Sequence, residues 1–244
     1  MNGYSENASH KNAPVAIFDI DGTLVDSRAV ITNAMAEAFT AQGLTPPNYD
    51  ATRHIVGLSL LEAVDKLAPR DMLHDDLLEL VERYKTAFVK ARQSGDDHEP
   101  LYVGVVDMLE TLKTSGWKIG VATGKSRRGL DAIIKRHDFG RFFDVHFCAD
   151  DGPGKPHPFM VQANLQALDA SAHHAVMIGD TSFDMIMASA AGVATIGVDW
   201  GFHTRAEVLE SGADKMVSTM EGLGLALGAF AKRLSRRKTI RAAI

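Results

Sequence analysis

Two aspartates, Asp19 and Asp21, directly follow a short apolar run at residues 15–18. A continuous run of aliphatic and aromatic residues is typical of a strand buried on both faces of a parallel sheet. Because burying a charge costs free energy, we expect the two carboxylates at the carboxyl edge of that sheet, where open α/β sheets bind ligands. Gly22 and Thr23 then turn the chain and offer backbone N–H groups to an anion. The alternative interpretation is a strand that ends in solvated acids before an ordinary turn.

Two further segments carry groups that could hold a phosphate. Thr123 and Gly124 follow the apolar run at residues 118–122. A hydroxyl beside free N–H groups at a strand-to-helix turn is a common phosphate-binding arrangement, although Thr123 could also be a simple helix N-cap. Lys155 lies between a glycine and a proline in the turn-rich segment 150–158. Its backbone is therefore restricted, and its ammonium group would place a positive charge beside a carboxylate and a phosphoryl group.

A second pair of acids lies further along the chain. Asp180 follows the apolar run at residues 175–178, and Asp184 comes one helical turn later on the same side of the expected helix. Two converging carboxylates repel each other unless a cation lies between them. Since their ligand atoms are oxygens and no cysteine is nearby, the pair favours Mg²⁺ over zinc. Otherwise Asp180 would be an N-cap, and Asp184 a favourable charge in the first helical turn.

All four segments share one property, because each lies at or just beyond the carboxyl end of an expected strand. The carboxyl ends of parallel strands meet at one edge of a sheet, so the acids, the lysine and the hydroxyl can converge there. The structural alternatives would have to hold for all four segments at once. We therefore predict a single phosphate-binding and cation-binding site at this edge.

Helical periodicity separates the first expected strand from the remaining ones. Apolar residues recur at helical spacing over residues 28–41, 58–67 and 73–89, and residues 94–100 are typical of a linker. From residue 101 onward helices and strands alternate, which indicates βαβ units with right-handed crossovers. We predict an α/β protein whose parallel sheet core is interrupted by a helical cap. The expected strands lie at 15–18, 118–122, 145–148, 175–178, 194–198 and 215–217, and the expected division is a flexible leader at 1–12, a catalytic core at 13–26 and 101–231, a helical cap at 27–100 and a basic tail at 232–244.

Composition restricts the class of protein. The chain has 244 residues, of which 45% are hydrophobic and 23% charged, as is ordinary for a globular protein with one or two cores. Its net charge of −5 argues against a dedicated nucleic-acid binder, and no apolar stretch reaches the roughly 18 residues of a membrane span. The single cysteine, Cys148, excludes an intramolecular disulfide and favours a cytoplasmic setting. The oligomeric state stays open.

The C-terminal tail differs in charge from the acidic remainder of the chain. Residues 232–244 contain six basic residues and no acid. A solvated last helical turn, whose positive charges complement the helix dipole, accounts for this pattern. A weak contact with anionic lipid, RNA or an acidic protein is the alternative.

The four motifs, in this order, resemble those of the haloacid dehalogenase superfamily of phosphotransferases. The matching segments are Phe-Asp-Ile-Asp-Gly-Thr at 18–23, Thr-Gly at 123–124, Lys-Pro at 155–156 and Gly-Asp-Thr-Ser-Phe-Asp at 179–184. The resemblance extends from residue 13 to about residue 217, and it implies a Rossmann-like core with the small helical-bundle cap of subclass I. Residues 190–193 and 196–201 are most similar to the phosphoglycolate phosphatase-like branch, which also contains pyrophosphatases.

This resemblance implies a role for each residue. Asp19 would attack phosphorus and form an aspartyl-phosphate, and Asp21 would protonate the leaving group and later activate water. The phosphoryl oxygens would be held by Thr123, Gly124 and Lys155. The oxygens expected to bind Mg²⁺ are those of the Asp19 carboxylate, the Asp21 backbone carbonyl, Asp180 and Asp184.

The expected function is Mg²⁺-dependent hydrolysis of a small phosphorylated metabolite, a phosphomonoester similar to phosphoglycolate. Asp21 favours reaction at phosphorus, since the dehalogenases of this superfamily act at carbon and lack an acid at that position. The alternatives are a phosphosugar mutase of the β-phosphoglucomutase type and an inorganic pyrophosphatase. A binding protein that no longer catalyses is a further alternative, against which the presence of all four acids argues.

The cap is expected to recognise the substrate. Arg53 and a histidine precede a glycine within residues 53–58, so Arg53 could clamp a carboxylate such as that of 2-phosphoglycolate. An exposed arginine at the start of a helix explains the same segment without a ligand.

Overall fold

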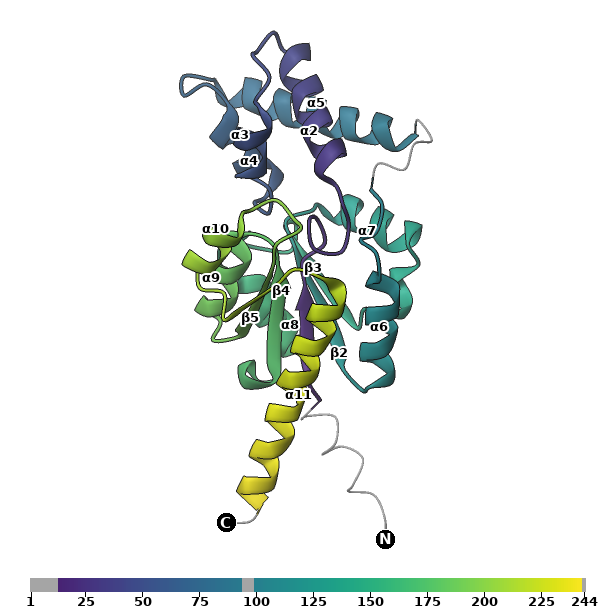
Figure 1. Ribbon diagram of the computed structural model, residues 1–244. Coiled ribbons are helices and arrows are strands. Elements are labelled where there is room, and N and C mark those ends of the chain that lie inside the picture. Colours follow the sequence, from purple (N-terminus) through teal and green to yellow (C-terminus); the bar gives the residue numbers. More distant parts are fainter. Residues whose placement is uncertain (1–12, 94–98, 243–244) are drawn as a thin grey trace.

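The computed structural model describes residues 13–93 and 99–242, with the side chains of the last helix up to Arg236. Its core is a six-stranded parallel sheet with the strand order β3-β2-β1-β4-β5-β6 (Figure 1). The strands are β1 (Val15–Phe18), β2 (Lys118–Thr123), β3 (Val145–Cys148), β4 (Ala175–Gly179), β5 (Ala194–Val198) and β6 (Lys215–Val217). The predicted α/β class is confirmed, and β2 and β4 each extend one residue beyond the predicted end.

The first strand occupies the middle of the sheet, between β2 and β4. Phe18 pairs with Val121 on one side and with Ile178 on the other. These three strands therefore end at the same edge, and the residues that follow them are brought together there. This edge is the point at which the strand order reverses, where doubly wound sheets bind their ligands.

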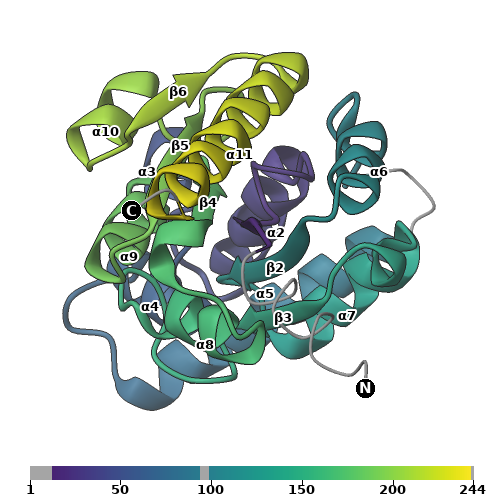
Figure 2. The ribbon, with the colours of Figure 1, turned by 90° about the horizontal axis from the view of Figure 1, so that it is seen from below.

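Helices cover both faces of the sheet. The helices of the core are α6 (Val105–Thr114), α7 (Arg127–Arg136), α8 (Phe159–Ala167), α9 (Ser182–Ala190), α10 (Arg205–Glu210) and α11 (Met220–Ala242), with 3-10 turns η1 (Phe139–Arg141) and η2 (Ala172–His174). Ala16 and Phe18 pack with α6, α7 and α11, whereas Val15 and Ile17 pack with α8 and α9 on the opposite face (Figure 2). Because both faces are covered, the strands are apolar without alternation.

A helical cap is inserted between β1 and β2 and lies over the carboxyl edge of the sheet (Figure 1). Its helices are α2 (Arg28–Ala41), α3 (Tyr49–Arg53), α4 (Leu60–Leu67) and α5 (His74–Gln93). The helix α4 begins two residues later than predicted because Ser59 and Glu62 form a capping box at its start. Met35, Phe39 and Leu80 belong to the buried cluster of the cap, which also includes Phe202 from the core. The cap therefore has its own apolar core, against which Phe202 and Phe183 of the sheet domain pack.

The last helix, α11, continues across residues 231 and 232, where the sequence predicted the boundary between core and tail. Leu223, Leu227 and Phe230 are buried against the sheet, and the helix then continues past the core to Ala242 (Figure 1). The predicted tail is thus mostly a continuation of this helix. Among the described helices, none is long and apolar enough to cross a membrane. The predicted leader, 1–12, and residues 94–98 of the predicted linker lie outside the described residues.

Candidate active site

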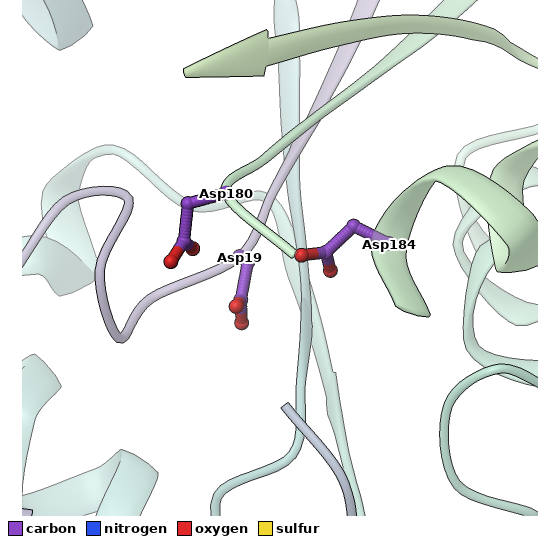
Figure 3. A group of neighbouring side chains, drawn as sticks. All are labelled: Asp19, Asp180 and Asp184. Carbon is purple, nitrogen blue, oxygen red and sulfur yellow. The ribbon is translucent and has the colours of Figure 1, made fainter. Parts of the chain in front are cut away.

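Three aspartates from two distant parts of the chain meet at the carboxyl edge of the sheet. Asp19 follows β1, Asp180 follows β4, and Asp184 lies in the first turn of α9. Each contributes a carboxylate oxygen to a group in which all these atoms lie within 4.8 Å of one another. Figure 3 shows Asp19 between Asp180 and Asp184, with the three carboxylates turned toward a common region. The three side chains are almost completely buried, at 1%, 0% and 0% exposure.

Two of the three carboxylates are held in place by neighbouring donors. The Thr23 hydroxyl donates to Asp180 Oδ1 at 2.8 Å, and the Phe202 N–H donates to Asp180 Oδ2 at 2.8 Å. Asp184 Oδ2 accepts from both the N–H and the hydroxyl of Thr181, at 3.1 and 2.7 Å, as part of a capping box. Asp19 Oδ2, in contrast, is buried without a hydrogen-bond partner. The cluster thus presents one fixed but unpartnered oxygen between two anchored carboxylates.

Lys155 places a positive charge in direct contact with the acidic cluster. Its ammonium Nζ lies 2.8 Å from Asp19 Oδ1 and 2.6 Å from Asp184 Oδ1, and the side chain is fully buried. Burial alone would lower the pKa of this lysine, but the two carboxylates raise it above its ordinary value. Lys155 is therefore a permanent cation at the base of the site. The sequence expectation that it lies beside Asp19 agrees with this geometry.

The electrostatics of the cluster favour an additional cation. Burial raises the pKa of Asp19 to about 7; Lys155 opposes this effect, and the charge of Asp184 adds to it. Burial and the charges of Asp19 and Asp184 also raise the pKa of Asp180 well above its ordinary value. One lysine does not neutralise three buried carboxylates, so a divalent cation would offset the remaining charge. An all-oxygen donor set with one unpartnered oxygen fits a hard cation such as Mg²⁺.

A pocket of about 630 Å³ lies above this cluster, between the sheet edge and the cap. Asp19 and Asp21 line it together with Thr123 and Gly124 from the end of β2. The opposite wall comes from the cap and is mostly apolar. The cap residues of this wall include Ile31, Met35, Val56, Leu58, Val81, Tyr84 and Phe88. Asp19, Asp21, Thr123 and Gly124 of the core therefore face a mostly apolar wall of the cap.

Some predicted residues have a different position from the one expected. Gly22 and Thr23, expected to contact the substrate, support Asp180 instead, and neither is among the residues that line the pocket. Gly22 has a φ of 76°, and a Cβ there would lie 2.2 Å from Asp180 Oδ2. Only glycine fits this turn because the carboxylate occupies the space of a side chain.

Arg53 does not reach the pocket in this structure. Its guanidinium pairs with Glu207 of α10 at 2.8 and 3.2 Å, and with Asp50 at 2.8 Å. His54 also contacts Glu207, at 2.9 Å. The Arg53 side chain therefore ties the cap to the core, and the segment just after it, from Ile55 onward, lines the pocket. Its role as a substrate clamp stays a prediction that requires the pair with Glu207 to break.

Three charged residues near Asp21 were not singled out from the sequence. Lys125 Nζ lies 2.8 Å from Asp21 Oδ1 and 3.4 Å from Glu99 Oε1, and Glu99 also pairs with Arg92. Burial alone would raise the pKa of Glu99, but Arg92 and Lys125 hold it below its ordinary value. Lys125 could have been suspected from its place directly after Thr123 and Gly124. Glu99 could not, because it belongs to a polar stretch typical of a solvated linker.

The parallel sheet, the inserted helical cap and the buried acid cluster are the features by which the chain can be compared with known hydrolases. Over residues 16–198 the chain matches the family model described as haloacid dehalogenase-like hydrolase, so the chain belongs to this family. A solved structure of a haloacid dehalogenase-like hydrolase from Streptococcus pneumoniae is 27% identical, with a TM-score of 0.74, over 90% of this chain and 98% of that chain. The resemblance inferred from the motifs is confirmed.

Curated relatives identify the kind of hydrolase. The probable phosphatase IndB of Dickeya dadantii is 32% identical over 209 residues, or 84% of this chain and 90% of that protein. The pyrophosphatase PpaX of Bacillus pumilus is 31% identical over 219 residues, covering 87% and 95%. The phosphoglycolate phosphatase of Agrobacterium fabrum is 28% identical over 228 residues, covering 92% and 95%. The chain is accordingly a phosphatase of the haloacid dehalogenase-like family.

Cation binding should depend on pH because Asp19 must lose its proton. Its raised pKa, about 7, means that a proton competes with the cation below neutrality. We expect the dissociation constant for Mg²⁺ to rise by at least about tenfold per pH unit below this value, because Asp180, whose pKa is also raised, must lose its proton as well. Isothermal titration calorimetry in buffers of different protonation enthalpy measures both the affinity and the protons released. An equal affinity at pH 6 and pH 8 would contradict the assignment.

Gly124 should be intolerant of a side chain because of the cap. A Cβ at this position would lie 2.5 Å from the Gly57 carbonyl oxygen and 2.6 Å from that of Leu58. We expect Gly124→Ala to push these cap residues away and to lower kcat/KM by about 10- to 100-fold, with little change in the melting temperature. Gly140→Ala is the matched control, since its nearest neighbour would lie at an ordinary 3.8 Å. Equal kinetics for the two variants would show that the contact is unimportant.

Proposed function

We propose that the protein is a Mg²⁺-dependent phosphatase that hydrolyses a small phosphomonoester through an aspartyl-phosphate on Asp19. One observation carries this proposal. The unpartnered Asp19 Oδ2 lies among two further carboxylates and the Lys155 ammonium, and Asp19 lines a pocket that also contains Asp21. A carboxylate fixed in this way, beside an independent acid, is suited to attack on phosphorus. The names of the phosphatase relatives support the same reaction class.

The first step forms a bond between Asp19 and phosphorus and breaks the bond from phosphorus to the leaving oxygen. Lys155 favours the ionised form of Asp19, because its ammonium lowers the pKa that burial raises. Asp21 donates its proton to the leaving oxygen, which departs as an alcohol. The Thr123 hydroxyl and the Gly124 N–H, from two residues that line the pocket, would donate to the phosphoryl oxygens.

The second step returns the enzyme to its starting state. Asp21, now ionised, removes a proton from water, and the water oxygen attacks phosphorus and releases Asp19 and inorganic phosphate. One residue can serve both steps because the first leaves it in the protonation state that the second requires. When bound by Asp19, Asp180 and Asp184, Mg²⁺ would neutralise charge on the phosphoryl oxygens. The apolar cap wall excludes competing water from the first step.

Pyrophosphate hydrolysis is a second candidate, and one feature of the pocket favours it. Four basic residues, Lys85, Arg92, Lys125 and Arg128, are among the residues that line the cavity; Arg92 is paired with Glu99, and Lys125 with Asp21. Basic side chains in this position would complement a leaving group that is itself an anion. The similarity to the pyrophosphatase PpaX agrees with this alternative.

Substitution of the two acids of the first motif tests the mechanism. We expect Asp19→Asn to abolish phosphate release, because an amide cannot attack phosphorus. We expect Asp21→Asn to lower kcat by about 10²- to 10⁴-fold, the usual contribution of a general acid or base. Phosphate release is measured with Mg²⁺ and again after the cation is removed with EDTA. Near-normal turnover by Asp19→Asn, or full activity in EDTA, would refute the proposal.

A substrate panel separates the phosphatase from its alternatives. The panel contains 2-phosphoglycolate, pyrophosphate and hexose phosphates, each assayed for inorganic phosphate and for isomeric sugar phosphate. We expect phosphate release, with the highest kcat/KM for a phosphomonoester. A preference for pyrophosphate would instead indicate that the basic residues of the pocket bind an anionic leaving group. Formation of an isomeric sugar phosphate without phosphate release would indicate a mutase.

A further inference from the structure

A continuous chain of ion pairs runs from the end of the cap to Asp21. The Arg92 guanidinium, in the last turn of α5, donates to both oxygens of Glu99, at 2.5 and 2.9 Å. Glu99 Oε1 lies 3.4 Å from the ammonium of Lys125, and the same ammonium lies 2.8 Å from Asp21 Oδ1. The Phe88 ring of α5 lies under both cations, 4.8 Å from the Arg92 guanidinium carbon and 5.4 Å from Lys125 Nζ. Four charges and one ring thus form a single array.

Burial gives this array its rigidity. The side chain of Glu99 is fully buried, and those of Lys125 and Asp21 are 7% and 11% exposed. The backbone of this segment is also fixed, because the Asp26 N–H donates to the Pro100 carbonyl and the imidazole of His137 contacts the Glu99 carbonyl at 3.0 Å. Taking these charges from water costs free energy that only their mutual pairing recovers. Such an arrangement holds a lysine in one geometry far better than a solvated pair would.

We propose that Lys125, held by Glu99 and Arg92, is a positioning residue for Asp21. This inference rests on the proposed role of Asp21 as the general acid. By pairing with Asp21 Oδ1, the ammonium fixes the rotation of the carboxyl group on the pocket wall and leaves Oδ2 as the atom that carries the proton, which is then delivered along one direction to the leaving oxygen. Because Arg92 belongs to the cap and Lys125 to the core, the array also ties the position of the acid to the position of the cap.

The test uses the dependence of the rate on the leaving group. Phenyl phosphate requires protonation of its leaving oxygen, whereas 4-nitrophenyl phosphate leaves as a stable anion and requires it far less. We expect Lys125→Met to lower kcat/KM for phenyl phosphate by about tenfold more than for 4-nitrophenyl phosphate. Glu99→Gln should change the ratio in the same direction, and Lys125→Arg, which keeps the cation, should restore most of it.

The ratio of the two rates removes effects of folding, because both esters are measured on one preparation of each variant. Using kcat/KM also restricts the readout to the steps up to the cleavage of the ester. Lys113→Met is the control, since Lys113 forms a pair of similar length with Asp144, at 2.7 Å, at a more exposed position, and is not among the residues that line the pocket. We expect this control to leave the ratio unchanged.

Two outcomes would overturn the inference, and they can be told apart from a failure of the proposed function. An equal loss for both esters in Lys125→Met, with a clear leaving-group dependence in Asp21→Asn, would show that Lys125 acts on the substrate or the fold and not on the acid. If Asp21→Asn itself shows no leaving-group dependence, Asp21 is not the general acid, and the inference fails as well. Turnover by Asp19→Asn would refute the proposed function alone.

Discussion

The structure depends on the cost of burying three carboxylates at one edge of a sheet. Asp19, Asp180 and Asp184 repel one another in a region from which water is excluded, and Lys155 offsets only part of that repulsion. The local structure is arranged around this charge. Gly22 leaves room for Asp180, the Thr23 hydroxyl and the Phe202 N–H hold it, and a helix start anchors Asp184. The remaining oxygen, Asp19 Oδ2, is buried without a hydrogen-bond partner.

The cap and the acid cluster are linked through the loop that follows β5. Phe202 donates its N–H to Asp180 and places its ring in the apolar core of the cap. Arg53 and His54 of the cap contact Glu207, which lies only a few residues after Phe202. One short loop therefore supports a cation-binding carboxylate and carries the contact between the two parts of the molecule. A movement of the cap would therefore shift residues of the site through this loop, and also through the ion pairs of Glu99.

The pocket combines two chemical surfaces that belong to different parts of the fold. The core contributes Asp19 and Asp21, together with Thr123 and Gly124, to the lining of the pocket. The cap contributes an apolar wall and, with the segment after β2, a basic margin. Family membership accounts for the first surface, since phosphoryl chemistry needs only positioning and neutralisation of charge. The second surface combines apolar and basic residues in one wall.

The sequence by itself determined the sheet, the cap and the acid cluster, because each has a local signal. Apolar runs mark the buried strands, helical spacing marks α2, and carboxylates directly after strands must lie at the sheet edge. Only the tertiary structure decided the partners of charged side chains. Arg53 turns to Glu207 instead of the pocket, and Glu99, within a polar stretch, becomes a buried partner of Lys125. The reason is that the partners of an ion pair come from segments that are distant in the sequence. No local pattern predicts which of these segments come together.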